Sequence, residues 1–139
     1  MKRMHIHIVA DDLEASTAFY TALFGQGPTV SKPDYAKWRI DNPRVNLAVS
    51  ATGSKSAGIE HVGIEVDTDE ERAEIETRLR SSEVKMVDEA DAHCCYAHSQ
   101  KHWTADPQNV VWEIFQTEAA IEVYGDETGP EMATATCCG

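Results

Sequence analysis

The sequence has no long apolar run, and this excludes an ordinary membrane-spanning helix. A helix that crosses a bilayer needs ~20 consecutive, mostly apolar residues, and no stretch of this chain has that length. The chain has a basic start, with Lys2 and Arg3, but no apolar segment of about 7–15 residues follows, so we expect no secretory signal peptide. We therefore expect a cytoplasmic protein without a membrane partner.

Basic residues are also scarce. The 139 residues include 12 Lys and Arg against 24 Asp and Glu, which gives a formal net charge of -12. Proteins that bind nucleic acids need clustered Lys and Arg to contact phosphates, and anionic membrane surfaces select the same residues. The charge balance argues against both partners. Because 42% of the residues are hydrophobic, the chain can still form one folded domain.

The four cysteines form two adjacent pairs, Cys94-Cys95 and Cys137-Cys138. Neighbouring cysteines close only a small, strained ring, and the cytosol is reducing, so we do not expect disulfides. Two adjacent thiols suit a soft ion such as Cd(II), Hg(II) or trivalent arsenic. The plainer alternative is that one thiol of Cys94-Cys95 faces the core and the other is incidental.

The first half of the chain has the pattern of a strand, a helix and further strands. Alternation around His5 predicts the strand, and apolar residues at helical spacing predict a helix after it, with Asp11 as its cap and Gly25 at its end. Short extended segments follow, separated by Gly, Pro, Asp and Asn. We expect these strands at residues 28–31, 36–40 and 45–50.

The same pattern restarts after a Gly- and Ser-rich connector. A strand around His61 precedes a helix that the capping box from Thr68 to Glu71 opens. Strands are then expected at residues 84–87, 94–98, 102–105 and 110–116. We interpret the repetition as an internal duplication of a βαβββ unit.

The duplication predicts an α+β fold in which two βαβββ modules form a partly closed sheet around a metal site. One domain would span residues 1–117, with module one at 1–50, a connector at 51–58 and module two at 59–117. The acidic tail, 118–139, carries Cys137-Cys138 and is expected to be mobile.

Three residues at corresponding places in this pattern form a candidate metal site: His5, His61 and Glu113. Two imidazoles and one carboxylate on one side of a metal leave the opposite positions open for dioxygen and substrate, which suits iron(II) oxygenases. Taken singly, a histidine on a strand is more often a core or surface residue, and Glu113 could face water. The joint pattern favours the metal site. Spacing alone does not choose between His5 and His7, because both lie on one face of the strand.

The segments that carry these residues resemble the vicinal oxygen chelate superfamily, which includes glyoxalase I, extradiol dioxygenases and fosfomycin-resistance proteins. The resemblance rests on residues 5–25, on 59–66 and on Asp106-Pro107 leading to Glu113, and it extends to about Thr117. It implies that His5 is the ligand and that His7 supports or packs beside it. Glyoxalase I has a fourth protein ligand, a carboxylate, but the corresponding stretch here, 45–49, contains none. This favours the branches with an open metal site.

The stretch from Cys94 to Ala97, followed by Lys101-His102-Trp103, and the segment 33–38 resemble the branch that holds the carbon–arsenic lyases and the cadmium-induced proteins. This resemblance implies iron(II)- and dioxygen-dependent cleavage of the carbon–arsenic bond of trivalent organoarsenicals, methylarsenite or aromatic ones, to give arsenite. Cys94 and Cys95 would bind arsenic as thiolates. Hydrogen-bond or proton donors would come from four residues that the sequence does not rank: Tyr96, His98, Lys101 and His102. Cys137 and Cys138 are candidate accessory thiols.

Several alternatives remain open at this stage. The chain could be a non-enzymatic binder of cadmium or trivalent arsenic, or another dioxygenase or a thiol transferase on the same scaffold. His93, His98 and His102 could instead join the cysteines in a closed zinc site, although the spacing matches no usual zinc pattern. Other divalent metals can occupy the same ligands as iron. Homodimers are frequent in the family, so the three ligands could come from one chain or two.

Overall fold

The computed structural model describes residues 1–51, 55–94 and 97–120, with the backbone alone for 90–94, 97–99 and 118–120. Its elements run in the order β1 (Arg3–Val9), α1 (Leu13–Phe24), β2 (Val30–Lys32), β3 (Tyr35–Asp41), β4 (Arg44–Ser50), β5 (Gly58–Glu65), α2 (Asp69–Ser81), β6 (Val87–Cys94), β7 (Ala97–Ala105) and β8 (Val111–Ala120). The order βαβββ therefore occurs twice.

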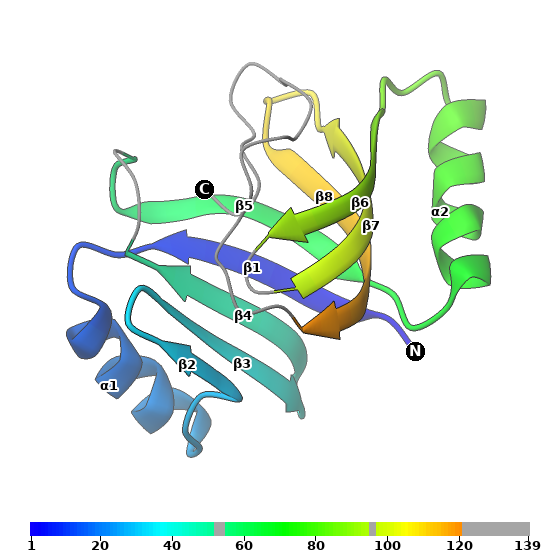
Figure 1. The fold of residues 1–139 in the computed structure, drawn as a ribbon. Coiled ribbons are helices and arrows are strands. Elements are labelled where there is room, and N and C mark those ends of the chain that lie inside the picture. The colour runs from blue at the N-terminus through cyan, green and yellow to red at the C-terminus, as the bar shows by residue number, and fades with distance from the viewer. Residues whose placement is uncertain (52–54, 95–96, 121–139) are drawn as a thin grey trace.

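All eight strands belong to one mixed sheet, in the order β2-β3-β4-β1-β5-β8-β7-β6. Each half pairs its first strand parallel to its last, β1 with β4 and β5 with β8. The two first strands, β1 and β5, pair antiparallel and join the halves at the centre of the sheet (Figure 1). The predicted α+β fold of two βαβββ modules is confirmed. The sheet is open, because β2 and β6 are its two ends.

Local sequence determines where both helices begin. Asp12, not the predicted Asp11, caps α1, because its carboxylate accepts a hydrogen bond from the backbone N–H of Ala15 at 3.0 Å. Gly25 ends α1 in the left-handed conformation, with φ 69°. Thr68 caps α2 as predicted by accepting from the N–H of Glu71, whose own carboxylate reaches back to the N–H of Asp67.

The strands of the second half differ from the prediction. Residues 84–86 lie outside any strand, and residues 87–94 and 97–105 form two long antiparallel strands, β6 and β7. These strands alternate poorly because several of their buried positions are polar. Asp88 accepts a hydrogen bond from His102 at 2.8 Å, and Glu89 accepts one from Trp103 at 2.8 Å. Such pairs allow polar side chains to occupy strand positions that an apolar pattern does not reveal.

The two faces of the sheet have different characters. One face packs against the helices through two apolar clusters, the larger one around Trp38, Leu47 and Val49, and the smaller one around Val66, Ile75 and Ile114. Because side chains alternate along a strand, the other face carries the remaining residues. This inner face is polar and buried at His5, His7, Asn46, Ser50, His61, Glu65 and Glu113. Buried polar groups are costly unless they are paired, which points to a functional surface.

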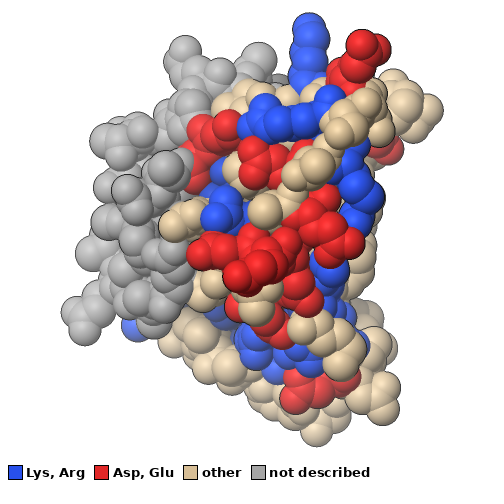
Figure 2. All heavy atoms as spheres, turned by 90° about the vertical axis from the view of Figure 1, so that its right-hand side faces the viewer, with Lys and Arg blue, Asp and Glu red and all other residues tan. Residues whose placement is uncertain are grey.

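Both helices are short, and α2, the helix of the second module, is strongly charged. Within the described ranges, neither helix has the length and apolar character needed to cross a bilayer. Seen from the α2 side, acidic and basic side chains are interspersed over the surface (Figure 2). Arg78 and Arg80 of α2 each pair with a glutamate four residues earlier, at 2.7 and 2.9 Å.

Candidate metal centre

The central strands bring the three predicted ligands together within one chain. β1, β5 and β8 are neighbours in the sheet, and they place His5, His61 and Glu113 on its inner face with 5%, 2% and 2% of their surfaces exposed. His61 Nε2 lies 3.2 Å from His5 Nε2 and 3.0 Å from Glu113 Oε2. His5 Nε2 lies 3.3 Å from the same carboxylate oxygen. Three ligand atoms therefore converge on one point.

The contacts of the two Nδ1 atoms determine which ring nitrogens carry protons. His5 Nδ1 lies 3.1 Å from the backbone carbonyl of Asn46, and a carbonyl oxygen can only accept a hydrogen bond. His61 Nδ1 contacts the carboxylate of Glu60, which is also an acceptor. Both Nδ1 atoms are therefore donors, and in its neutral form each imidazole directs its Nε2 lone pair at the other.

Three acceptor atoms that face one another repel unless a positive charge, either a proton or a metal ion, lies between them. Metal–ligand bonds to histidine nitrogen and carboxylate oxygen are about 2.1 Å long, so neighbouring ligand atoms stand about 3.0 Å apart at right angles and about 3.4 Å apart at tetrahedral angles. The observed separations of 3.0, 3.2 and 3.3 Å fall in this interval. The donor set fits a divalent metal.

Charge around the centre also suits a cation. Burial by itself raises the pKa of Glu113, but the Lys101 ammonium and the hydrogen bonds from His5 and His61 hold its pKa well below the usual range. Glu113 is therefore ionised. Burial by itself lowers the pKa of His61, but hydrogen bonds to Glu113 and Glu60 outweigh it and raise the pKa. The raised pKa favours a proton on His61 Nε2 in the metal-free protein, at the place that a metal ion would take.

Glu60 supports the centre, and the sequence pattern did not reveal it. Alternation predicts that Glu60 and His61 point to opposite faces, but the pairing of β1 with β5 shifts register here. His7 faces His61 and Ile8 faces Ile59, which leaves Glu60 as the extra residue of a β-bulge. The bulge turns the Glu60 carboxylate onto His61 Nδ1 and His7 Nδ1, while Lys55 Nζ binds its other oxygen at 2.5 Å. Carboxylates of this kind orient metal-binding histidines.

His7 belongs to the same hydrogen-bond network. It is fully buried, its Nδ1 lies 3.3 Å from Glu60, and its Nε2 lies 3.0 Å from the Ser50 hydroxyl. Burial lowers the pKa of His7 to about 4, so its ring is neutral at pH 7. Its Nδ1–H donates to Glu60, and its Nε2 accepts from Ser50. His7, Glu60 and His61 therefore satisfy one another, in contrast to the three acceptors of the candidate metal centre.

Lys101 lies at the cluster, whereas His102 does not. Lys101 is buried, its Nζ lies 2.5 Å from Glu113 Oε1, and it stands over the rings of Trp103 and Phe115. Because Oε1 is held by Lys101, Oε2 is the oxygen directed at the imidazoles. His102 alternates to the helix side of the sheet, where it contacts Asp88, Glu76 and Arg72. The sheet separates His102 from the cluster, so its predicted role as a donor there has no support.

The other predicted site residues lie largely outside the described part of the chain. Cys95, Tyr96, Cys137 and Cys138 are outside it, and only the backbone of Cys94 and His98 is described. Cys94 is the last residue of β6 and pairs with Ala97, and His98 of β7 pairs with His93. The roles predicted for these residues stay predictions.

The equivalent registers of the two halves identify the counterpart of Glu113. Gly63 stands two residues after His61 and pairs with Glu113, while His7 stands two residues after His5 and pairs with Ala48. Ala48 is buried on the inner face, and its methyl group cannot bind a metal. Strand β4 therefore supplies no ligand at the position where β8 supplies Glu113.

This architecture and the sequence identify the family. Residues 2–114 match the sequence model of the Glyoxalase/Bleomycin resistance protein/Dioxygenase superfamily. The chain belongs to this superfamily. The predicted vicinal oxygen chelate membership is thereby confirmed.

The similar proteins are of two kinds, organoarsenical cleaving enzymes and cadmium-induced proteins. The chain is 34% identical to a trivalent organoarsenical cleaving enzyme of Bacillus sp. (strain MD1), over 99% of this chain and 91% of that protein. It is 33% identical to one from Thermomonospora curvata, over 99% and 89%. It is also 30% identical to the cadmium-induced protein CadI of Mycobacterium bovis, over 100% and 95%. These names agree with the branch that the sequence resembles.

Solved structures share the fold at low sequence identity. Homoprotocatechuate 2,3-dioxygenase from Brevibacterium fuscum superposes with a TM-score of 0.63 at 17% identity, over 88% of this chain and 34% of that one. The Mn(II)-bound glyoxalase from Novosphingobium aromaticivorans gives a TM-score of 0.59 at 14% identity, over 88% and 43%. Both are larger proteins of which this chain matches a part.

Proposed function

We propose that this protein is an enzyme that cleaves the carbon–arsenic bond of trivalent organoarsenicals and releases arsenite. The observation that carries the proposal is the convergence of His5 Nε2, His61 Nε2 and Glu113 Oε2 within 3.0–3.3 Å, in a chain that resembles organoarsenical cleaving enzymes over nearly its whole length. We propose iron(II) as the metal that these three residues hold.

Iron(II), when bound, would supply the electrons that activate dioxygen. The protein's own groups prepare the site for it. Glu60 and the carbonyl of Asn46 keep both Nδ1 atoms protonated, so both Nε2 atoms stay free to bind. Lys101 holds one oxygen of Glu113 and leaves the other for the metal. Ala48 cannot bind a metal, so β4 would leave ligand positions for substrate and dioxygen.

The cysteine pair completes the proposal. Cys94 and Cys95 would each lose a proton to hydroxide leaving from arsenic, so that two arsenic–sulfur bonds replace two arsenic–oxygen bonds. Such binding would hold the organic substituent in a fixed orientation for the reaction. We further propose that the protein acts in the cytoplasm, where thiols stay reduced, and that the fold functions as one domain over residues 1–117.

The direct test is anaerobic reconstitution with iron(II), addition of methylarsenite and oxygen, and identification of the arsenic products. Arsenite formation that requires both iron(II) and oxygen is expected. His61→Ala and Glu113→Ala should abolish turnover and keep arsenic binding, because they remove metal ligands and leave the thiols in place. Cys94→Ser and Cys95→Ser should abolish arsenic binding and keep metal binding. Turnover without iron, or in the cysteine variants, would contradict the proposal.

A second candidate is a non-enzymatic protein that binds cadmium or trivalent arsenic through Cys94 and Cys95. The similarity to CadI, a cadmium-induced protein, favours it. This function predicts tight binding of Cd(II) that His61→Ala leaves unchanged, and no turnover of any organoarsenical. The buried ligand cluster on β1, β5 and β8 would then have no role in binding, which is why we favour the enzyme.

A further inference from the structure

Trp103 of β7 packs against a proposed metal ligand, the imidazole of His61. Its side chain lies on the inner face, because Trp103 pairs with Glu113 of β8 and cross-strand partners point to the same side of a sheet. The centroids of the Trp103 and His61 rings lie 5.2 Å apart with their planes at 81°, which is an edge-to-face contact. Trp103 is buried, so this contact is shielded from water.

The contact constrains the plane of the His61 ring. The lone pair of Nε2 lies in that plane, so a strong metal bond requires that the plane also contain the metal ion. Glu60 holds one atom of the ring, Nδ1, and a ring held at one atom can still tilt about it. An aromatic partner packed at right angles opposes the tilt. Metal ligands must keep their orientation to within about 10–20°, so this restraint bears on metal binding.

Trp103 is itself held in place by Glu89 of β6. The indole Nε1–H donates a hydrogen bond to Glu89 Oε2 at 2.8 Å. Glu89 pairs with Lys101 across the strands, so its side chain is also on the inner face, and it is buried there. A carboxylate is costly to bury unless it is hydrogen-bonded, and an indole nitrogen can only donate. Glu89 and Trp103 therefore fix one another.

Lys101 adds a further restraint on Trp103. Its Nζ lies 5.6 Å from the centroid of the Trp103 ring and 2.5 Å from Glu113 Oε1. A cation over an aromatic ring is attracted to it. Trp103 is thus restrained by Glu89 at its nitrogen and by Lys101 at its ring, and it transmits both restraints to His61.

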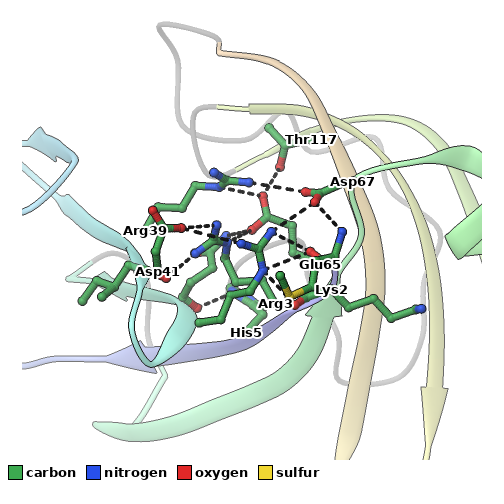
Figure 3. Close-up of polar contacts among 12 residues, drawn as sticks. Lys2, Arg3, His5, Arg39, Asp41, Glu65, Asp67 and Thr117 are labelled. Carbon is green, nitrogen blue, oxygen red and sulfur yellow. Dashed lines mark hydrogen bonds and ion pairs between the residues drawn. The ribbon is translucent and has the colours of Figure 1, made fainter.

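The other proposed imidazole ligand, His5, is supported in a different way. Its Nδ1 donates to the backbone carbonyl of Asn46, and the Asn46 amide donates to Glu65 at 3.2 Å. Arg39 lies 3.4 Å and Arg3 lies 3.6 Å from the Glu65 carboxylate (Figure 3). This support acts through hydrogen bonds and ion pairs, whereas the support on the β7 side of the centre is aromatic.

We propose that Trp103 is a positioning residue that fixes the plane of the His61 imidazole, and that Glu89 acts on the metal centre through Trp103. The inference rests on the metal site of the proposed function and adds two supporting residues to it. Loss of the indole N–H, or of the carboxylate that accepts it, should therefore change the geometry of the bound metal and not only the stability of the fold.

Metal binding in the absence of any arsenical tests the inference. Cobalt(II) is the probe, because its visible absorption depends on the geometry of its ligands. Trp103→Phe keeps an aromatic ring without the N–H, and Glu89→Gln keeps the shape of the side chain without its charge. Each should weaken Co(II) binding by about tenfold and shift the visible bands. Glu89→Gln should add nothing to Trp103→Phe in the double variant, because the Phe ring has no N–H to hold.

The chain offers a matched control for each substitution. Trp38 is also buried and donates from Nε1 to the Gln26 carbonyl at 3.2 Å, but it lies in the apolar cluster under α1. Asp88 precedes Glu89 on β6 and accepts from His102 on the other face of the sheet. Trp38→Phe and Asp88→Asn should keep the Co(II) affinity and spectrum of the wild type, even where they lower the free energy of unfolding.

Wild-type Co(II) affinity and spectrum in both Trp103→Phe and Glu89→Gln would overturn the inference. So would an equal loss in Trp38→Phe, because general destabilisation would then explain the effect. A further loss from Glu89→Gln in the double variant would also overturn it, because Glu89 would then act by another route. If Trp103→Phe does not fold, Glu89→Gln and its control decide by the same two measurements.

Turnover of methylarsenite by the iron(II)-loaded wild type separates this inference from the proposed reaction. If methylarsenite is cleaved but both variants bind Co(II) like the wild type, only the positioning role fails. If no arsenical is cleaved but the variants show the expected changes, the proposed reaction fails and the positioning role stands. A wild type that binds no Co(II) would overturn both.

Discussion

Glu60 and His61 are adjacent in the chain, yet the carboxylate of Glu60 binds Nδ1 of His61 on the inner face of the sheet. The β-bulge at Glu60 makes this possible, because it turns a side chain that a regular strand directs to the other face. The same carboxylate also accepts from His7. One irregular residue therefore fixes the proton position on a proposed metal ligand and connects it to a buried neighbour.

Glu60→Gln should weaken metal binding without unfolding the protein. An amide accepts more weakly than a carboxylate and cannot orient both imidazoles, and loss of such a supporting group typically costs about 10–100-fold in metal affinity. Competition for Mn(II) or Fe(II) with a coloured chelator measures the change. Glu70→Gln, at an exposed position of α2, is the control and should bind like the wild type. Unchanged affinity in Glu60→Gln would remove Glu60 from the site.

Lys101→Met should destabilise the metal-free protein by about 3–5 kcal/mol, because it leaves the buried Glu113 carboxylate without its ammonium partner. Bound metal supplies a positive charge at the other oxygen, so the loss should be smaller in the metal-loaded protein. Urea unfolding with and without Mn(II) measures both values. Adding Glu113→Gln to Lys101→Met should recover part of the loss. A loss that metal does not reduce would argue against Glu113 as a ligand.

Gly63→Ala should disturb the centre through the backbone of β8. A Cβ at position 63 would meet the carbonyl oxygen of Glu113 at 2.3 Å and its Cβ at 3.1 Å, so β8 must shift. We expect a destabilisation of about 1–3 kcal/mol and a clear loss of metal affinity. Gly27→Ala is the control, because a Cβ there meets nothing within 4 Å. Denaturant unfolding of both variants measures the change in stability, and competition with a chelator measures the change in metal affinity.

His7 should make the metal-free protein less stable in acid. Its folded pKa of about 4 lies below the usual histidine value of 6.5, so between these values the unfolded chain binds a proton that the folded protein does not. Stability should fall as the pH drops from about 7.5 toward 4, by about 3 kcal/mol from this residue. His7→Gln should reduce this pH dependence.

The comparison of wild type and His7→Gln isolates the effect of His7. The pKa of His61 is raised, so His61 contributes in the opposite sense: its contribution is full at low pH and is lost as the pH rises through the folded pKa. His61 is present in both proteins, so only the part of its effect that passes through its contacts with His7 and Glu60 differs between them. Unfolding free energies at pH 5.0 and 7.5 measure the change, and identical pH dependence in both proteins would contradict the assignment.

Much of the fold follows from local sequence. The limits of α1 are encoded by a capping aspartate and by Gly25, and the repeated strand–helix–strands pattern identifies two modules because each unit carries its own hydrophobic periodicity. The second-half strands were harder to predict. Asp88, Glu89, His102 and Trp103 satisfy one another across β6 and β7, and a single strand does not show its partner.

The sequence alone determined the residue types of the candidate centre and their places in the repeat: His5 and His61 on equivalent strands and Glu113 on the last one. Only the tertiary structure decided that their ligand atoms meet, that Glu60 turns inward, and that Lys101 lies beside Glu113 while His102 faces α2. The reason is physical. A strand sets which face each side chain occupies, but strand pairing, register and bulges determine which faces meet, and these depend on residues far apart in the chain.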